Sequence, residues 1–266
     1  MVPSREPPPV HVCTAFGVSH HDAERLAGEG NAWLCGDVVL RQVSDRAHAV
    51  WLARTFAAID SPDIRIARPL QTTDGRWVIA GWAAGRHVPG TPEDRPDEVV
   101  LTAVRLHRAT AHLPRPDFLS RRTDIASVAE RIAWGEQDAE LDETKGGRWF
   151  EVLAPARRPV KLPDQLVHGE LFGTVLFDGD APPGIVDFVP YFRPAEWGAA
   201  IAAVDAIAWG GADGELLRRW SHLPDWPQLL LRAALFRLAF NALHPRSTAA
   251  ALDGLRMAAS EVSDLI

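Results

Sequence analysis

Cysteine is scarce in this chain, with only Cys13 and Cys35 among 266 residues. Two thiols form no disulfide framework, and no His or further Cys residues complete a metal-ligand spacing around them. This usage is typical of the reducing cytoplasm. The first ten residues are rich in proline and lack the apolar core of a signal peptide. We therefore expect a cytoplasmic protein.

Basic residues are outnumbered, since 28 Lys and Arg stand against 35 Asp and Glu and give a net charge of −7. Binding to nucleic acid as a main function would need a basic face and is not expected, whereas a nucleotide can bind through local features. Long apolar runs are also missing, because Asp205 interrupts one and Arg232 and Arg237 interrupt another. A membrane helix needs about 20 apolar residues, so we expect no membrane association.

The first third of the chain carries strand and turn signals. Residues 26–43 alternate apolar runs with glycine turns, and Gly36-Asp37 is a hairpin signal. Residues 66–70 and 77–82 flank a second turn. These segments predict a small antiparallel sheet of about five strands.

Helical periodicity dominates from residue 84 onward. The expected helices cover residues 44–59, with Ser44 as a candidate cap, and residues 96–111, 125–134, 148–154, 196–209, 227–243 and 247–266. The fold class is therefore α+β, with a flexible arm at residues 1–15, an N-lobe at residues 16–83 and a larger helical C-lobe at residues 84–266.

Residues 166–209 organise the rest of the chain. Short apolar runs at 175–177 and 185–186 flank a turn rich in Gly, Pro and Asp, which predicts a hairpin. Glu170 precedes this hairpin and Asp187 follows it, so two carboxylates are expected at its mouth. One could accept a proton from a hydroxyl while the other holds a metal ion against a phosphate. The alternative is a plain hairpin with surface acids.

These residues resemble the aminoglycoside phosphotransferase and choline kinase group, which has the protein-kinase-like fold. That group carries a His-Gly-Asp loop, an Asn, a hairpin and an Ile-Asp-Phe element. The matching elements here are His-Gly-Glu at 168–170, Thr174, Val-Leu-Phe at 175–177 and Ile-Val-Asp-Phe at 185–188. The run at 186–194 is similar to an actinobacterial branch of the group.

The resemblance implies roles for these residues, and some of them depart from the group's pattern. Glu170 stands in place of the catalytic Asp, and Thr174 stands in place of a metal-binding Asn, one residue closer than usual. Asp187 is retained as the expected magnesium ligand. Asp205, an acid on an apolar helix, needs a partner, and the group has a structural Asp at this place.

The N-lobe positions are implied in the same way. Gly28 and Gly30 would lie over phosphates, although a tight turn is the ordinary interpretation of such a pair. Arg41 stands where the fold carries a phosphate-binding Lys, with an exposed strand Arg as the alternative. Residues 81–84, including Trp82, would form the hinge that meets adenine. Residues 47–59 contain no acid, so the usual ion pair to the strand cation is not expected.

The resemblance therefore implies an ATP- and magnesium-dependent phosphotransferase that acts on a small molecule. The altered motif residues favour an alternative, a pseudokinase that binds a nucleotide or a protein partner without turnover, because small displacements of reacting groups cost large factors in rate. Nucleotidylation in a reoriented site is a third hypothesis. The acceptor cannot be deduced, since acceptor pockets are built from variable helices and loops.

Overall fold

The computed structural model describes residues 6–26 and 32–266. The chain forms two compact units, the first made of Met1–Thr91 and Leu176–Asp187 and the second of Pro92–Val175 and Phe188–Ile266. The first unit thus extends eight residues past the expected boundary at 83. It also contains a late segment of the chain, Leu176–Asp187.

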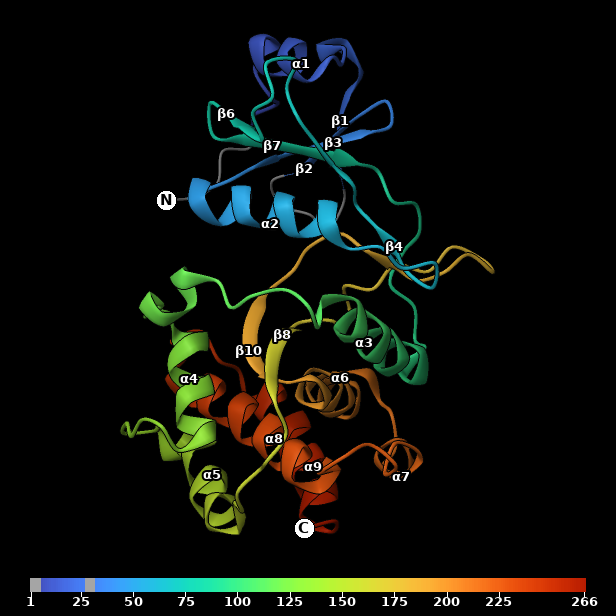
Figure 1. Cartoon of the computed structure of the whole chain (residues 1–266). Helices are drawn as coiled ribbons and strands as arrows, with labels where there is room; N and C mark the ends of the chain where they lie inside the picture. Colours follow the sequence, from blue (N-terminus) through green and yellow to red (C-terminus); the bar gives the residue numbers. More distant parts are fainter. Residues whose placement is uncertain (1–5, 27–31) are drawn as a thin grey trace. The chain divides into compact units, whose positions relative to one another are not determined.

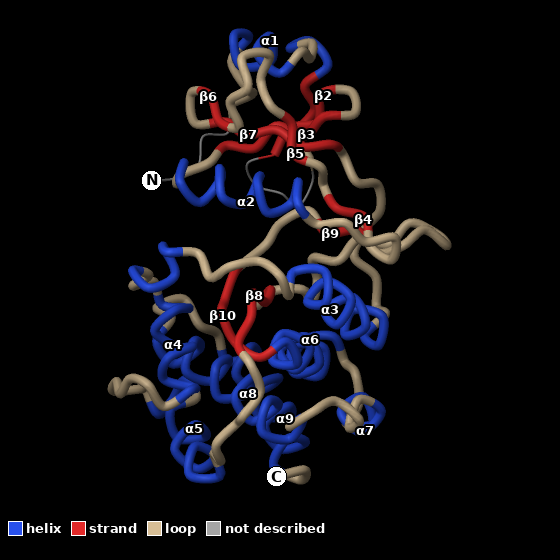
Figure 2. The backbone as a smooth tube through the Cα atoms, in the orientation of Figure 1, coloured by secondary structure: helices blue, strands red, loops and turns tan. Residues whose placement is uncertain are grey.

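A six-stranded antiparallel sheet is the main feature of the first unit (Figures 1 and 2). Its strands lie in the order β1-β2-β3-β7-β5, and β6 pairs with β7. This sheet confirms the antiparallel arrangement that the turn signals predicted. The strands are β1 (Ala23–Arg25), β2 (Ala32–Cys35), β3 (Val38–Gln42), β5 (Pro69–Leu70), β6 (Val78–Ile79) and β7 (Trp82–Arg86).

Helix α1 (Val10–Phe16) packs on one face of this sheet. Val12 and Phe16 share a core cluster with Leu40 and Trp82. Residues 10–15 of the expected arm are therefore part of a packed helix, and the short turn η1 (His20–Asp22) leads from α1 into β1. A seven-residue helix is too short to be stable alone, so its packing against the sheet holds it in place.

Helix α2 (Arg46–Ala58) lies on the opposite face of the sheet from α1 (Figure 1). Asp45 caps it, because its carboxylate accepts hydrogen bonds from the backbone N–H groups of Ala47 at 2.8 Å and His48 at 3.1 Å. The expectation that Ser44 is the cap was therefore wrong by one residue. Asp and Ser are equally good caps by propensity, so composition could not decide between them.

The late segment of the first unit contains the predicted hairpin in a minimal form. Leu176 and Gly184 exchange backbone hydrogen bonds of 2.9 and 2.7 Å. Strand β9 (Gly184–Ile185) then pairs in parallel with β4 (Arg65–Ile66).

The second unit is mainly helical, as predicted for residues after 84. Strands β8 (Asp164–His168) and β10 (Pro190–Pro194) form its two-stranded antiparallel sheet (Figure 2). Its helices are α3 (Pro96–Thr110), α4 (Ile125–Trp134), α5 (Gly147–Leu153), α6 (Ala195–Gly210), α7 (Glu215–Arg219), α8 (Trp226–Leu243) and α9 (Ala249–Ser263), with 3₁₀ turns η2 (Asp117–Arg121), η3 (Glu143–Lys145) and η4 (Ala154–Ala156).

Helices α6 and α8 form the centre of this unit and are buried on nearly all sides. A helix that is apolar all round belongs in a core. Trp197 and Trp226 are almost fully buried there. Where α9 crosses α6, a Cβ on Gly254 would lie 1.9 Å from the carbonyl oxygen of Ala208, so glycine permits the close approach.

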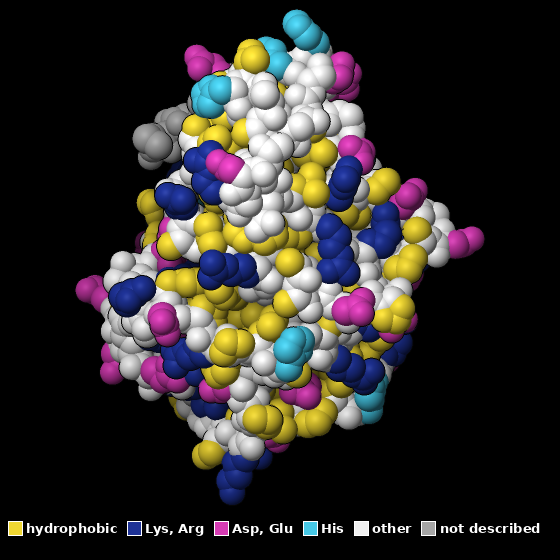
Figure 3. All heavy atoms as spheres, turned by 45° about the horizontal axis from the view of Figure 1, so that its top comes forward, with side chains coloured by type: hydrophobic (Ala, Val, Ile, Leu, Met, Phe, Trp, Pro, Cys, Tyr) yellow, Lys and Arg dark blue, Asp and Glu magenta, His cyan; other side chains and the backbone are white. Residues whose placement is uncertain are grey.

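The whole chain has the expected α+β class. In the parts that the structure describes, no helix combines the length and apolar character needed to cross a bilayer. Side chains of both charge signs occur across the face shown in Figure 3, so this face is not uniformly basic.

Candidate functional site

The His-Gly-Glu motif begins at His168, the last residue of β8, and continues beyond the strand. The apolar residues of β8 are buried, and the antiparallel register places His168 opposite Pro190 of β10. A Cβ on Gly169 would lie 2.3 Å from Cε2 of Tyr191, so only glycine fits at the second position. The chain then turns outward and leaves Glu170 exposed. The pairing of β8 with β10 thus fixes the position of the motif at the end of the two-stranded sheet. The segment from residue 168 to residue 174 is called the 168–174 loop below.

His107 on α3 connects this loop to α6. Its Nε2 accepts a hydrogen bond from the backbone N–H of His168 at 3.0 Å, and its Nδ1 lies 2.8 Å from the carbonyl oxygen of Ala195. Because a carbonyl only accepts, Nδ1 carries the proton and the ring is neutral. Burial lowers the pKa of His107 to about 4.

Hydrogen bonds within the 168–174 loop also stabilise its conformation. His168 is buried, and its Nδ1 accepts a hydrogen bond of 3.0 Å from the backbone N–H of Glu170. The hydroxyl of Thr174 donates to the carbonyl oxygens of Glu170 at 2.7 Å and Leu171 at 3.0 Å. The hydroxyl proton of Thr174 is therefore used to shape the turn that presents Glu170.

A buried ion pair supports the loop from α8. Arg237 donates through Nε and Nη2 to the carboxylate of Asp205 at 2.7 and 2.5 Å, and Nη2 also donates to the carbonyl oxygen of Gly169 at 3.0 Å. Burial would lower the pKa of Arg237, but the carboxylates of Asp205 and Glu170 raise it above its ordinary value. Asp205 thus has the partner that its apolar helix required.

Arg41 lies in β3, a central strand of the first unit's sheet, paired with β2 and β7. Side chains alternate along a strand, and the neighbouring Leu40 faces the α1 side of the sheet. Arg41 therefore points to the side that α2 covers. Since α2 contains no acidic residue, it offers no carboxylate to pair with Arg41.

Asp187 is exposed at the end of the first unit's late segment. Arg65 fixes this segment, since its Nε donates to the carbonyl oxygen of Pro182 at 2.6 Å and its Nη1 to that of Pro89 at 2.9 Å. Asp187 belongs to the first unit and Glu170 to the second. Their joint use in one site therefore stays a prediction.

The expected hinge at residues 81–84 takes a different form. Gly81 is at the turn into β7, and Trp82 begins β7, paired with Gln42 and Ile79. The Trp82 side chain is buried in the core beside α1. The chain passes to the second unit only after Thr91, so residues 81–84 lie inside the first unit. Gly81, Ala83 and Ala84 are small residues that occur in linkers as well as in strands, which is why the sequence suggested a hinge.

The predicted glycine loop lies outside the described residues. Gly28 and Gly30 belong to the connection between β1 and β2. Their expected contact with phosphates therefore stays a prediction.

No cluster of ligand side chains marks a metal site in the described part of the chain. In residues 6–26 and 32–266 there is no group of three or more His, Cys, Asp or Glu side chains placed to hold an ion. Magnesium needs less than that, because it usually binds through one or two carboxylates, substrate phosphates and water. The exposed carboxylate of Asp187 and the hydroxyl oxygen of Thr174 are donors of the type that magnesium prefers.

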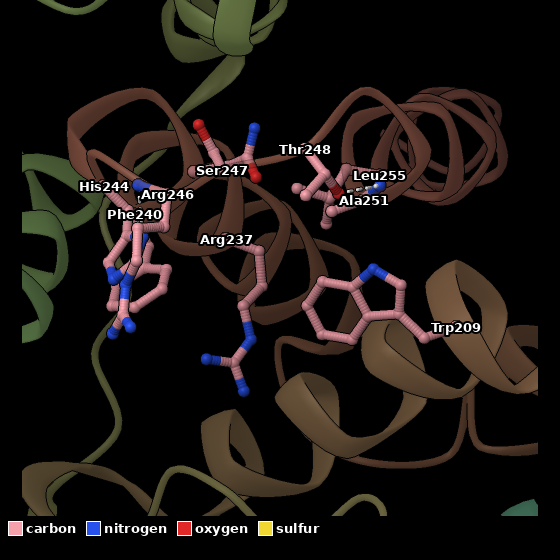
Figure 4. Close-up of a pocket in the computed structure, with 10 residues that line it drawn as sticks. Trp209, Arg237, Phe240, His244, Arg246, Ser247, Thr248, Ala251 and Leu255 are labelled. Atoms are coloured by element: carbon pink, nitrogen blue, oxygen red, sulfur yellow. Dashed lines mark hydrogen bonds between the residues drawn. The ribbon is translucent and has the colours of Figure 1, made fainter.

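A pocket of about 220 Å³ lies in the second unit, at the ends of α6 and α8 and the start of α9 (Figure 4). Trp209, Arg237, Phe240, Arg246 and Ser247 are among the residues that line it. Arg237 therefore faces both this pocket and the 168–174 loop.

The sequence did not single out His107, Arg237 or this pocket as functional. The available signal was a pair of opposite charges in two apolar helices, Asp205 in one and Arg237 in the other. Buried charges of opposite sign usually pair. No comparable signal linked His107 to the backbone of His168.

No protein-family model and no curated protein matches the sequence. Solved structures match it over most of its length. A spectinomycin phosphotransferase, APH(9)-Ia, in complex with ADP and spectinomycin, is 11% identical, with 96% of each chain covered and a TM-score of 0.58. A thermostable variant of the aminoglycoside phosphotransferase APH(4)-Ia, in complex with ADP and hygromycin B, is 15% identical, with 96% of each chain covered and a TM-score of 0.54.

The macrolide 2′-phosphotransferase MphH from Brachybacterium faecium is 14% identical, with 85% of this chain and 86% of that chain covered and a TM-score of 0.55. At these identities the similarity concerns the fold. The chain has the protein-kinase-like fold that is found in aminoglycoside and macrolide phosphotransferases.

Proposed function

We propose that this chain is an ATP-dependent phosphotransferase that acts on a hydroxyl group of a small molecule. The proposal rests on the hydrogen bonds that fix the 168–174 loop. His107, Arg237 and Thr174 all hydrogen-bond to its backbone, and the loop presents the exposed carboxylate of Glu170. Phosphoryl transfer depends on such fixed positioning more than on covalent chemistry.

In this proposal each residue has a defined task. Glu170 orients the acceptor hydroxyl and accepts its proton. Arg41 contacts the phosphates of the nucleotide, and Gly28 and Gly30 let backbone N–H groups approach them. Asp187, with the Thr174 oxygen, would hold magnesium, which when bound supplies neutralisation of phosphate charge. Two of the similar structures are complexes with ADP, which supports nucleotide binding here.

A pseudokinase is the second candidate, and two observations favour it. The Thr174 hydroxyl already donates to two loop carbonyls, and α2 contains no acidic residue. Under this alternative the chain binds a nucleotide, or a protein partner, without transferring phosphate.

Replacing Asp187 tests the nucleotide site. Asp187→Ala should abolish magnesium-dependent ATP binding, measured by isothermal titration calorimetry, because it removes the proposed carboxylate ligand. The melting temperature should stay close to that of the wild type, since Asp187 is exposed. Asp180→Ala is the matched control, as Asp180 is an exposed acid of the same late segment. Equal ATP affinity in Asp187→Ala and wild type would show that the metal assignment is wrong.

A further inference from the structure

Arg65 of β4 is the centre of a hydrogen-bonded junction within the first unit. Its Nε donates to the carbonyl oxygen of Pro182 at 2.6 Å, its Nη1 to that of Pro89 at 2.9 Å and its Nη2 to that of Leu176 at 3.4 Å. Leu176 and Pro182 lie on the two arms of the late segment, residues 176–187, on either side of its turn. One side chain therefore joins both arms to each other and to the chain at Pro89.

The backbone pairing of the late segment is short. Leu176 and Gly184 exchange two hydrogen bonds, and the parallel pair of β4 and β9 is two residues long (Figure 2). Pro182 and Pro183 have no backbone N–H group to donate. Because a short pair of strands is at best marginally stable by itself, we expect the order of this segment to depend on the hydrogen bonds that Arg65 supplies.

The chain just before the first unit ends packs closely against the same segment. Thr91 and Phe177 exchange backbone hydrogen bonds of 3.0 and 2.9 Å. A Cβ on Gly184 would lie 2.6 Å from Cγ1 of Val88. Gly90 has a φ of +116°, and a Cβ there would overlap the carbonyl oxygen of Phe177. These contacts leave little room for the late segment to shift while Arg65 holds it.

The same junction determines where Asp187 lies. The backbone N–H of Arg65 donates to the carbonyl oxygen of Pro183 at 2.8 Å, and that of Ala67 donates to the carbonyl oxygen of Ile185 at 3.0 Å. Asp187 follows Ile185 by two residues. The backbone of β4 thus sets the register of the chain that leads to Asp187, and the Arg65 side chain fixes the turn that precedes it.

We infer that Arg65 is a positioning residue for the magnesium site, because it holds the segment from which Asp187 presents its carboxylate. The inference rests on the proposed function, since Asp187 is a metal ligand only under that proposal. It goes beyond that function by assigning the metal affinity to a side chain that does not touch the ion.

The chemistry of this role suits arginine. A guanidinium stays charged and presents its donors in a planar fork, so it can bind three carbonyl oxygens at once, whereas a lysine ammonium is a point charge on a flexible stem. Asp178 lies 3.8 Å from Nη1 of Arg65, but its side chain is 53% exposed. Exposed ion pairs contribute little, so the bonds to the carbonyl oxygens are the important ones.

Calorimetric titration with ATP over a range of magnesium concentrations tests the inference. Arg65→Ala should need about tenfold more magnesium than the wild type for the same gain in ATP affinity, since losing the groups that orient a metal ligand typically costs about 10–100-fold. ATP affinity in EDTA should be unchanged, because no metal ligand is needed there. A general loss of structure would instead weaken ATP binding under both conditions.

Three further variants identify the interaction that matters. Arg68→Ala is the matched control, because Nη1 of Arg68 donates to two carbonyl oxygens outside the late segment, at 3.2 and 2.7 Å. It should keep the magnesium requirement of the wild type, and so should Asp178→Ala. Arg65→Lys should raise the magnesium requirement although it keeps the charge, and it serves as the test variant if Arg65→Ala does not fold.

Hydrogen exchange without metal or nucleotide gives an independent readout. The backbone N–H groups of Leu176 and Gly184 are hydrogen-bonded to each other's carbonyl oxygens and should exchange slowly in the wild type. Arg65→Ala should speed exchange in peptides that cover residues 176–187 and leave peptides from β3 unchanged. Arg68→Ala should not speed exchange in residues 176–187.

The results separate this inference from the proposed function. A magnesium requirement that rises in both Arg65 variants, with faster exchange in residues 176–187, supports the inference. If the wild type depends on magnesium but the Arg65 variants keep its requirement, or if exchange in residues 176–187 is unchanged, the inference is overturned and the proposed function stands. Wild-type ATP affinity that is independent of magnesium would contradict the proposed metal site itself, and the inference would fail with it.

Discussion

Asp205 and Arg237 are the charged residues on which the 168–174 loop depends most. Both side chains are almost fully buried, with exposed fractions of 4% and 8%. Removing one partner of such a pair leaves the other charge buried and uncompensated. Asp205→Ala should therefore lower the free energy of unfolding by about 3–5 kcal/mol.

Urea unfolding measures this loss. Asp253→Ala is the control, because Asp253 pairs with Arg256 at an exposed site on α9, and surface pairs contribute at most about 1 kcal/mol. An Asp205→Ala variant with unchanged stability and lost ATP binding would place Asp205 in the nucleotide site instead.

His107 gives the protein a pH dependence of known sign. Its pKa is lowered to about 4 by burial, whereas a histidine in the unfolded chain has a pKa of about 6.5. The unfolded state therefore binds a proton that the native state does not bind between these values. The stabilising effect is complete above about pH 6.5 and is lost as the pH falls toward 4, by about 3 kcal/mol in total.

Denaturant unfolding at pH 7.5 and pH 4.5 tests this expectation. The wild type should lose more stability over this interval than His107→Gln, whose side chain does not titrate. Equal losses in the two proteins would show that His107 is not the group responsible.

At the scale of single residues, the sequence identified the polar motif residues but not the hydrogen bonds that position them. Glu170, Asp187, Thr174 and Arg41 stand next to glycine, aromatic or strand signals that mark their positions. His107 contacts a backbone group 61 residues away, and a contact of this kind follows no spacing rule. The packing of α3 against the end of β8, which brings His107 and His168 together, depends on the three-dimensional fold and not on a local sequence pattern.

At the scale of elements, α6 depends on a glycine in its interior. Gly→Ala in a helix normally stabilises by about 1 kcal/mol. Gly198 is an exception, since a Cβ there would lie 2.2 Å from Cε1 of His107 and 3.1 Å from the carbonyl oxygen of His168. Gly198→Ala should therefore lower the melting temperature instead of raising it.

A double variant shows whether the ring is the cause. Gly198→Ala combined with His107→Ala should cost less than the sum of the two single losses, because the small side chain removes the clash. A stabilised Gly198→Ala protein, or simple additivity of the two losses, would contradict the close contact.

Helices with long apolar or amphipathic runs were the easiest elements to predict. For α4, α6 and α8 the predicted first and last residues agree with the structure to within one residue (Ile125–Trp134, Ala195–Gly210, Trp226–Leu243). Helix α1 was missed because it follows a proline-rich stretch and owes its stability to packing. Residues 81–84 were assigned to a hinge because glycine beside small residues suits both a linker and a strand.

At the scale of the whole molecule, the candidate residues are divided between the two units. Arg41 and Asp187, proposed to serve the nucleotide, belong to the first unit. Glu170, proposed to act on the acceptor, belongs to the second. Phosphoryl transfer under this account therefore requires both units, whereas a pseudokinase could function with nucleotide contacts alone.

Substitutions at Glu170 distinguish an active phosphotransferase from a pseudokinase. A Glu reaches one methylene further, and the short distance along the chain from Glu170 to Thr174 can withdraw the loop to compensate. Glu170→Asp should then fail to improve the enzyme, because the shorter acid no longer reaches the hydroxyl. In a degenerate site, Glu170→Asp combined with Thr174→Asn would instead create turnover that the wild type lacks.

Magnesium-dependent ATP consumption by wild type and Glu170→Gln, in the presence of a broad panel of small-molecule acceptors with hydroxyl groups, tests the central claim most directly. We predict turnover by the wild type and a reduction of about 10²–10⁴-fold in Glu170→Gln, with little change in ATP affinity, since general-base assistance is typically of this size. Turnover that survives Glu170→Gln, or no turnover by the wild type with any acceptor, would contradict the account.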